Sequence, residues 1–230
     1  MTEENRLARA LSQAPASLRL RAALQAGVVP RDEQIAVLVR RCAVEDDFYV
    51  RDMLTWALTR HTRERVLEAV VGELDAAQPQ ARAQALHTLS KLRDPSAWLA
   101  VMDGHLCDPN PDVAAAAWRA AVALAPGAEA PRLGRVLLGQ FERSDGPLLR
   151  SLARALAALG EAAAASLRAA ATTPARARFV EEVERIREDP AAGFGEALAA
   201  AMRLRTLGSA DHARPHTAAS AEDEGGHAHR

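Results

Sequence analysis

Residues Glu45–His61 read EDDFYVRDMLTWALTRH, a stretch that contains both a turn and the helix that follows it. Val50, Leu54 and Leu58 recur at every fourth position, and this spacing places apolar side chains on one face of an α-helix. The acidic run before them is typical of a helix N-cap. The remaining polar and aromatic residues suit either a catalytic constellation or one decorated unit of a repeat, and the rest of the chain decides between these two interpretations.

Similar turn-and-helix stretches recur at a period of about 32 residues. Aligned on the residue that follows each turn, their anchors are Arg19, Arg51, Arg82, Ala114, Arg150 and Arg178, separated by 32, 31, 32, 36 and 28 residues. Between them lie further segments with helical spacing, which begin at Glu33, Arg63, Ser96, Pro131 and Glu161. The chain is therefore predicted to form about six antiparallel helical hairpins.

Local signals mark the helix starts and the two ends of the array. Proline follows an acid or a threonine at several starts, including Asp108-Pro109 and Thr173-Pro174, and proline at the first helical position loses no hydrogen bond. Because one hairpin cannot bury its own apolar face, the hairpins must stack and both ends must be covered. We expect Thr2–Ser12 to form a polar first helix. We expect Ala191–Leu207 to form an amphipathic closing helix that covers the last hairpin with Phe194, Leu198, Met202 and Leu204.

The pattern of a turn acid or proline, then Val-Arg, then spaced alanine and leucine resembles the HEAT family of helical repeats, as found in bacterial HEAT-repeat proteins. VRDMLTWAL from Val50 and ARAQALHTL from Ala81 show it best, and it extends over roughly residues 5–190. The resemblance implies an all-α, right-handed α-α superhelix, a HEAT/armadillo-like solenoid in which the second helix of each hairpin lines a concave side. Ala114 departs from the pattern, since arginine is expected there. Residues 1–207 are predicted to form this repeat domain, and 208–230, polar and low in complexity, a disordered tail.

The composition disfavours several classes of partner. The net charge is −1, so no overall field draws the chain to nucleic acid or to an anionic membrane. No apolar run approaches the ~20 residues that span a bilayer. The N-terminus has no apolar signal region, and Cys42 and Cys107 both fall in apolar helical patterns. We therefore expect a cytoplasmic protein with two reduced core thiols and with neither nucleic acid nor membrane as a partner.

Motifs for catalysis and metal binding are missing from the sequence. There is no HExxH, no GxSxG and no glycine-rich phosphate loop, and the His-Glu pairs of HEAT-like di-iron hydroxylases do not occur. Three histidines lie along the helical segments without metal-ligand spacing, namely His61, His87 and His105. The other four lie within the predicted tail, namely His212, His216, His227 and His229. We expect no enzyme, no cofactor and no metal site.

The side of each second helix that faces away from the core gives the candidate partner-binding surface. Asp52, Trp56 and Arg60 form a stripe at four-residue intervals, and the next two hairpins add more members at matching places. These are Gln84, His87, Lys91 and Arg119. Trp56 leaves two interpretations open: an exposed anchor for a partner, or an ordinary core residue between neighbouring helices.

These observations favour a non-catalytic binding or scaffold module that holds a protein partner in a concave groove, with a small apolar ligand as the less favoured occupant. Two other classes stay open. One is a regulatory ligand-sensing domain. The other is a HEAT-like DNA alkylpurine glycosylase, whose concave Asp and Trp could be imitated by Asp52 and Trp56, although the neutral charge disfavours it.

Overall fold

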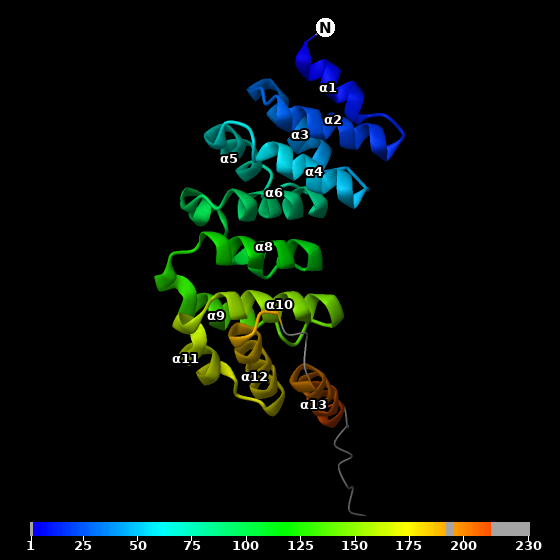
Figure 1. Cartoon of the computed structure of the whole chain (residues 1–230). Coiled ribbons are helices and arrows are strands. Elements are labelled where there is room, and N and C mark those ends of the chain that lie inside the picture. The colour runs from blue at the N-terminus through cyan, green and yellow to red at the C-terminus, as the bar shows by residue number, and fades with distance from the viewer. Residues whose placement is uncertain (1, 192–195, 213–230) are drawn as a thin grey trace, which may run out of the picture.

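The computed structural model describes residues 2–191 and 196–212, which form helices stacked in chain order (Figure 1). The helices are α1 (Glu3–Leu11), α2 (Ala16–Val28), α3 (Ile35–Cys42), α4 (Phe48–Leu58), α5 (Arg63–Val71), α6 (Pro79–Leu92), α7 (Asp103–Leu106), α8 (Pro111–Leu124), α9 (Ala130–Leu138), α10 (Gly146–Ala158), α11 (Glu161–Ala170), α12 (Pro174–Glu188) and α13 (Glu196–His212). Short 3-10 segments, Asp32–Gln34, Pro95–Ala100 and Gly127–Glu129, precede α3, α7 and α9. Within the described ranges no helix is long and apolar enough to cross a membrane.

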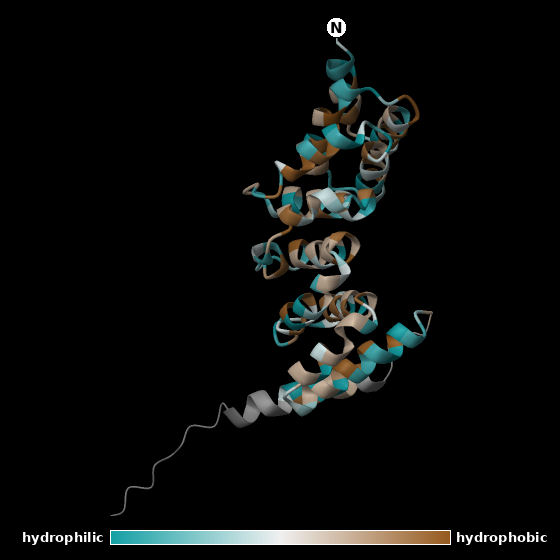
Figure 2. Cartoon of the chain, turned by 90° about the vertical axis from the view of Figure 1, so that its left-hand side faces the viewer, coloured by the Kyte–Doolittle hydropathy of each residue, from teal (hydrophilic) through white to brown (hydrophobic). Residues whose placement is uncertain are grey.

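The described helices form six hairpins, arranged in two rows. In chain order the hairpins are α1/α2, α3/α4, α5/α6, α7/α8, α9/α10 and α11/α12. In one row α2, α4, α6, α8, α10 and α12 each contact the next, and in the other α3 contacts α5 while α9 contacts α7 and α11. A continuous set of buried apolar side chains fills the space between the rows. Figure 2 shows more tan and brown in the middle of the stack than at its N-terminal end. The predicted all-α solenoid of helical hairpins is confirmed.

The apolar face predicted for the opening stretch is the buried face of α4. Val50, Leu54 and Leu58 are all nearly inaccessible to solvent. Large side chains fill the wider parts of the core: Trp118 is fully buried and its indole Nε1 donates to the carbonyl of Leu106 at 2.9 Å. Alanine fills the narrower parts, and α8 alone buries five of them, at 114, 116, 117, 120 and 121. The alanine-rich composition therefore lets neighbouring helices approach closely.

The helix predicted from Ser96 is broken in the structure. The Asp94 carboxylate accepts the Ser96 amide at 3.0 Å and starts the 3-10 segment instead, and Met102 is extended before the single turn of α7. Cys107 follows α7 directly and is exposed, so the prediction of a core thiol is wrong for this residue. Cys42 is buried as predicted, and burial raises the pKa of its thiol to about 12.

The N-caps also correct one predicted helix start and two predicted anchor positions. α8 starts at Pro111 with Asn110 as its N-cap, so Asp108-Pro109 does not open the helix. In the first three hairpins the anchor arginine lies four residues after the N-cap. Counted from Asp145 and Thr173, the same position in the last two hairpins is Leu149 and Ala177. The predicted anchors Arg150 and Arg178 were therefore one residue out of register.

Polar contacts hold the first helix to the array. Thr2 caps α1 by accepting the Asn5 amide at 3.3 Å. The side chains of Glu3 and Glu4 then pair with the second hairpin, at 2.8 Å to Arg31 and 3.0 Å to Arg40. The predicted polar first helix is therefore present, and it is fixed by ion pairs as well as by burial of Leu7 and Leu11.

At the other end α13 packs against α12 (Figure 1). Leu198 is buried and Met202 is partly buried against the core, as predicted, whereas Leu204 is 37% exposed and is not part of the core. Phe194 lies outside the described residues. The helix continues to His212, past the predicted boundary at 207, and residues 213–230 of the predicted tail also lie outside the described part.

Candidate functional site

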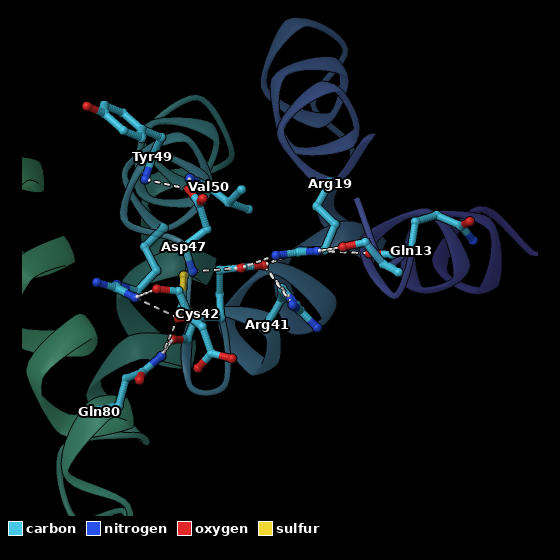
Figure 3. A network of polar contacts seen from close by, with 12 residues as sticks. Gln13, Arg19, Arg41, Cys42, Asp47, Tyr49, Val50 and Gln80 are labelled. Atoms are coloured by element: carbon cyan, nitrogen blue, oxygen red, sulfur yellow. Dashed lines mark hydrogen bonds and ion pairs between the residues drawn. The ribbon is translucent and has the colours of Figure 1, made fainter. Parts of the chain in front are cut away.

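The acid that opens the stretch EDDFYVRDMLTWALTRH joins two hairpins. The Glu45 side chain is fully buried, and it accepts hydrogen bonds from Arg19 of α2 at 2.7 and 2.8 Å and from Arg41 of α3 at 2.7 Å. Its Oε1 also accepts the Asp47 amide at 3.0 Å. Burial alone would raise the pKa of Glu45, but these hydrogen bonds outweigh it and lower the pKa to about 2. Figure 3 shows Arg19 and Arg41 converging at this point.

The same arrangement recurs two hairpins later. Arg82 of α6 donates to Asp108 Oδ2 at 3.0 Å, and Asp108 Oδ1 accepts the Asn110 amide at 2.8 Å. In both cases the arginine lies four residues after one N-cap and the acid two residues before the next. We call this arrangement, Arg19–Glu45 and Arg82–Asp108, the turn clamp. Asp47, by contrast, caps α4 as predicted, since its Oδ1 accepts the Tyr49 and Val50 amides.

Other junctions lack the turn clamp. Counted from the N-cap Gln78, the acid position opposite Arg51 is Ala76. Gln80 replaces the clamp by donating to the carbonyls of Cys42 at 3.0 Å and Glu45 at 2.8 Å. Ala114 is fully buried and offers no donor to the fifth hairpin, as its departure from the repeat pattern predicted. The polar residues around the turns thus have structural partners, and functional groups must be sought elsewhere.

A groove crosses the second helices of four consecutive hairpins. Its first part has a volume of about 610 Å³, spans α4, α6, α8 and α10, and has both signs of charge. Its second part, of about 560 Å³, lies toward the carboxyl ends of α6, α8 and α10. Arg119 and Ser151 line both parts, so the two are continuous. We call the whole the inner groove. Its first part is the mixed section, which contains Arg51, Asp52, His87, Asp112 and Arg119. Its second part is the basic section, which contains Lys91, Arg93, Arg119 and Arg154.

The structure brings together five of the seven predicted site residues. Those that line the mixed section are Asp52, Gln84, His87 and Arg119, and Lys91 joins Arg119 in the basic section. Trp56 and Arg60 line neither section. Whether a partner binds at these residues stays a prediction, but their shared groove gives that prediction a defined location.

Trp56 combines the two interpretations that the sequence left open. Its ring lies so close over Gly27 of α2 that a Cβ at position 27 would be 2.2 Å from indole Cζ3. The side chain still leaves 37% of its surface exposed. The indole packs toward the first hairpin, whereas Asp52 lines the mixed section. The glycosylase alternative, which uses these two residues, stays a hypothesis.

Electrostatic effects show that the groove residues lie close to one another. Burial, together with the charges of Arg119 and Lys91, lowers the pKa of His87 to about 4, and Asp52 opposes this effect. His87 is therefore neutral at pH 7. Partial desolvation also lowers the pKa of Arg119, although its side chain reaches solvent. Gln84 Oε1 is buried and has no hydrogen-bond partner in the described part of the chain.

The sequence analysis missed Arg93 and Arg154, and a signal existed for the second. Counting nine residues from the N-caps of the second to fifth hairpins gives one column along the second helices, Trp56, His87, Arg119 and Arg154, and the last three of these line the inner groove. The anchor in the fifth hairpin was one residue out of register, which moved the expected member of the column to Ala155. Aligning the repeats on their caps would have found Arg154. Nothing in the sequence pattern singled out Arg93.

Within residues 2–191 and 196–212, no group of three His, Cys, Asp or Glu side chains is placed to hold a metal ion.

Comparisons with known proteins identify no family. No protein-family model matches the chain, and no curated protein matches it either. Solved structures that are similar include an engineered protein from the Northeast Structural Genomics Consortium, with 16% identity, a TM-score of 0.42, and coverage of 92% of this chain and 98% of that one. A designed armadillo repeat protein has 13% identity, a TM-score of 0.39, and coverage of 89% and 99%. The complex of CpcE and CpcF of phycocyanin lyase from Nostoc sp. PCC7120 has 15% identity, a TM-score of 0.38, and coverage of 90% of this chain and 95% of that one. Membership of the HEAT family stays a prediction.

Proposed function

We propose that this chain is a non-catalytic binding module whose inner groove holds an extended segment of a partner protein. The observation that carries the proposal is the set of hydrogen-bonding groups in the groove that the described chain leaves without partners. They include the Lys91 ammonium and the Arg119 guanidinium, whose side chains are exposed to solvent. Such groups can bond a ligand without first breaking an internal contact.

The size of the inner groove suits a peptide. Packed helices lie about 8–10 Å apart, so the row from α4 to α10 spans roughly 25–30 Å. An extended chain of about eight residues covers that length. Phe48 lies at the edge of the mixed section with 65% of its surface exposed, and it offers an apolar contact to one end of such a segment. Solenoids commonly use a continuous inner surface of this kind for binding.

A small apolar ligand fits the same groove less well. The mixed section has polar side chains on each of α4, α6 and α8, namely Asp52, Gln84 and Arg119 among others. An apolar ligand would cover these groups without bonding them, and covering an unpaired polar group opposes binding. The lining therefore favours an occupant with its own backbone amides and polar side chains.

The test is selection of peptides from a random display library on the full chain, followed by fluorescence anisotropy with the selected peptides. Ala115 is half-buried and lines the mixed section, so Ala115→Tyr should obstruct the groove. Ala162→Tyr, on an exposed position of α11 in the other row, is the matched control. We expect Ala115→Tyr to weaken binding by roughly tenfold or more and the control to leave it unchanged. Equal binding by both variants, or no selected peptide at all, would contradict the proposal.

A further inference from the structure

The basic section collects cations from three helices and no carboxylate lines it. Lys91 and Arg93 come from the end of α6, Arg119 from the middle of α8 and Arg154 from α10, and all four side chains are exposed to solvent. The rest of its lining is small or apolar, with Ser90 and Val122 among the members. Elsewhere in the chain, acids and arginines are interspersed and the net charge is −1. A local positive surface in a neutral protein therefore needs a reason.

Three of these cations have no internal partner. Across the described residues, the side chains of Lys91, Arg93 and Arg119 make no hydrogen bond and no ion pair, whereas the turn arginines are bonded to acids and carbonyls. Cations in the last turn of a helix are favoured by its dipole, which would account for Lys91 without any ligand. That explanation does not extend to Arg119, which lies in the middle of α8. Nor does it explain why the charges converge on one groove.

Arg93 adds a second, independent observation. It has φ 50° and ψ 40°, the left-handed conformation, at the C-cap of α6, and no other non-glycine residue in the described ranges has a positive φ. Helices that end in this conformation usually do so with glycine, because a Cβ there costs about 1–2 kcal/mol. An arginine at this position is less stable than glycine would be. The left-handed arginine therefore makes its side chain a candidate for a functional role.

We propose that the basic section recognises an acidic stretch of the partner polypeptide, in which aspartate or glutamate carboxylates bond Lys91, Arg93 and Arg119. This inference rests on the proposed function and names the chemistry of the bound segment. Arginine binds carboxylates through two parallel hydrogen bonds, and such charge-assisted bonds are about twice as strong as neutral ones. Val122, Ala123 and Ala155 offer apolar contact to the methylene groups of the same segment.

Nucleic acid fits the basic section less well than an acidic peptide does. Single strands bind by stacking bases on aromatic side chains, and none of the residues that line the basic section is aromatic. Duplex DNA is held by roughly 6–10 phosphate contacts, more than the cations of this section provide.

The experiment uses the full chain and a fluorescein-labelled peptide of repeating Glu-Glu-Leu-Ala, with Gln-Gln-Leu-Ala as the uncharged probe and oligo-dT as the phosphate probe. Binding is followed by anisotropy at low and at physiological salt. We expect the glutamate peptide to bind roughly tenfold or more tightly than the glutamine peptide, and oligo-dT to bind more weakly than the glutamate peptide. Higher salt should weaken the glutamate complex, since its contacts are ionic.

Matched variants locate the effect. Arg93→Gln and Arg119→Gln should each weaken the glutamate peptide by roughly tenfold. Arg135→Gln, at an exposed arginine of α9 in the other row, should change it by less than about twofold. Circular dichroism shows that each variant is folded.

Three results would overturn the inference: equal affinity for the two peptides, tighter binding of oligo-dT, or loss of binding in Arg135→Gln as large as in Arg119→Gln. If library-selected peptides bind through the groove while the glutamate peptide does not, the inference fails and the proposed function stands. If no peptide of either kind binds, both fail.

Discussion

Arginines serve two different ends in this molecule. In the turn clamp Arg19 and Arg82 are mostly buried, and each satisfies an acid of the next hairpin and two carbonyls of its own turn. In the basic section Arg93 and Arg119 are exposed, and the described chain gives their side chains no hydrogen bond or ion pair. The same side chain stabilises the array where its charge is neutralised, and stays available for binding where it is not. Stability and binding should therefore respond to different substitutions.

The largest effect on stability is expected at Glu45, the most buried residue of the turn clamp. Glu45→Ala leaves Arg19 and Arg41 without their shared acceptor, and removing one partner of a buried ion pair costs roughly 3–5 kcal/mol in the free energy of unfolding. Urea unfolding followed by circular dichroism measures it. Glu33→Ala, at an exposed acid without an ion pair in the described residues, is the control and should change stability by less than about 0.5 kcal/mol. If the two variants lowered the unfolding free energy equally, the ion pairs of Glu45 would not be the source of the stabilisation.

Acid should remove the same stabilisation. The pKa of Glu45 is about 2 in the folded chain and 4.5 in its ordinary state, so the folded state favours the ionised carboxylate. The stabilisation is therefore fully present above about pH 4.5 and is lost as the pH falls toward 2. Its size is roughly 3 kcal/mol. The difference in unfolding free energy between the native chain and Glu45→Gln should shrink over this range, and a difference that is constant from pH 7 to pH 2 would argue against the clamp.

A smaller effect is expected at the second clamp. Arg82→Gln leaves the nearly buried Asp108 carboxylate short of a partner and should cost about 2 kcal/mol. Arg51→Gln is the matched variant, since Arg51 occupies the same repeat position and faces no acid. It should cost less than Arg82→Gln in the same urea experiment. The reverse order would mean that the carbonyl contacts, and not the acid, give the clamp its strength.

A substitution in the inner groove should change the stability in the opposite direction. Arg93→Gly removes the backbone cost of a left-handed arginine and should raise stability by roughly 1 kcal/mol, while it weakens binding of the acidic peptide. Arg93→Gln keeps the backbone cost and removes only the charge, so it should weaken binding without the gain in stability. A loss of stability in Arg93→Gly would show that the arginine side chain contributes to the fold.

The smallest effect on stability is expected at Arg119. Because its guanidinium has no hydrogen bond or ion pair in the described chain, Arg119→Gln should change the unfolding free energy by no more than about 0.5 kcal/mol. The thermal midpoint, measured by calorimetry beside that of Arg82→Gln, checks this. A loss as large as that of Arg82→Gln would place Arg119 with the structural arginines.

The local pattern of the chain was enough for the hairpins and their buried faces. Val50, Leu54 and Leu58 share a face because a helix turns once every ~3.6 residues, and nothing beyond the helix itself is needed to know it. The same reasoning placed Gln84, His87 and Lys91 on one stripe of α6. It failed in the fifth hairpin, where Arg150 was taken as the anchor, and that shift of one residue concealed Arg154. Helix caps, which fix the register of each repeat, are a better reference than a single residue type.

What the sequence by itself determined is therefore most of the helices, the apolar face of each, and the row that the second helices form. These follow from periodicity and turn chemistry, which act over a few residues. Only the tertiary structure decided which polar groups are neutralised. Arg19 meets Glu45 and Arg82 meets Asp108 across 26 residues, and Trp56 rests on Gly27, because the length of each connection sets how one hairpin lies against the next. Side-chain pairing over such distances depends on the stacking of whole hairpins, and no local pattern contains it.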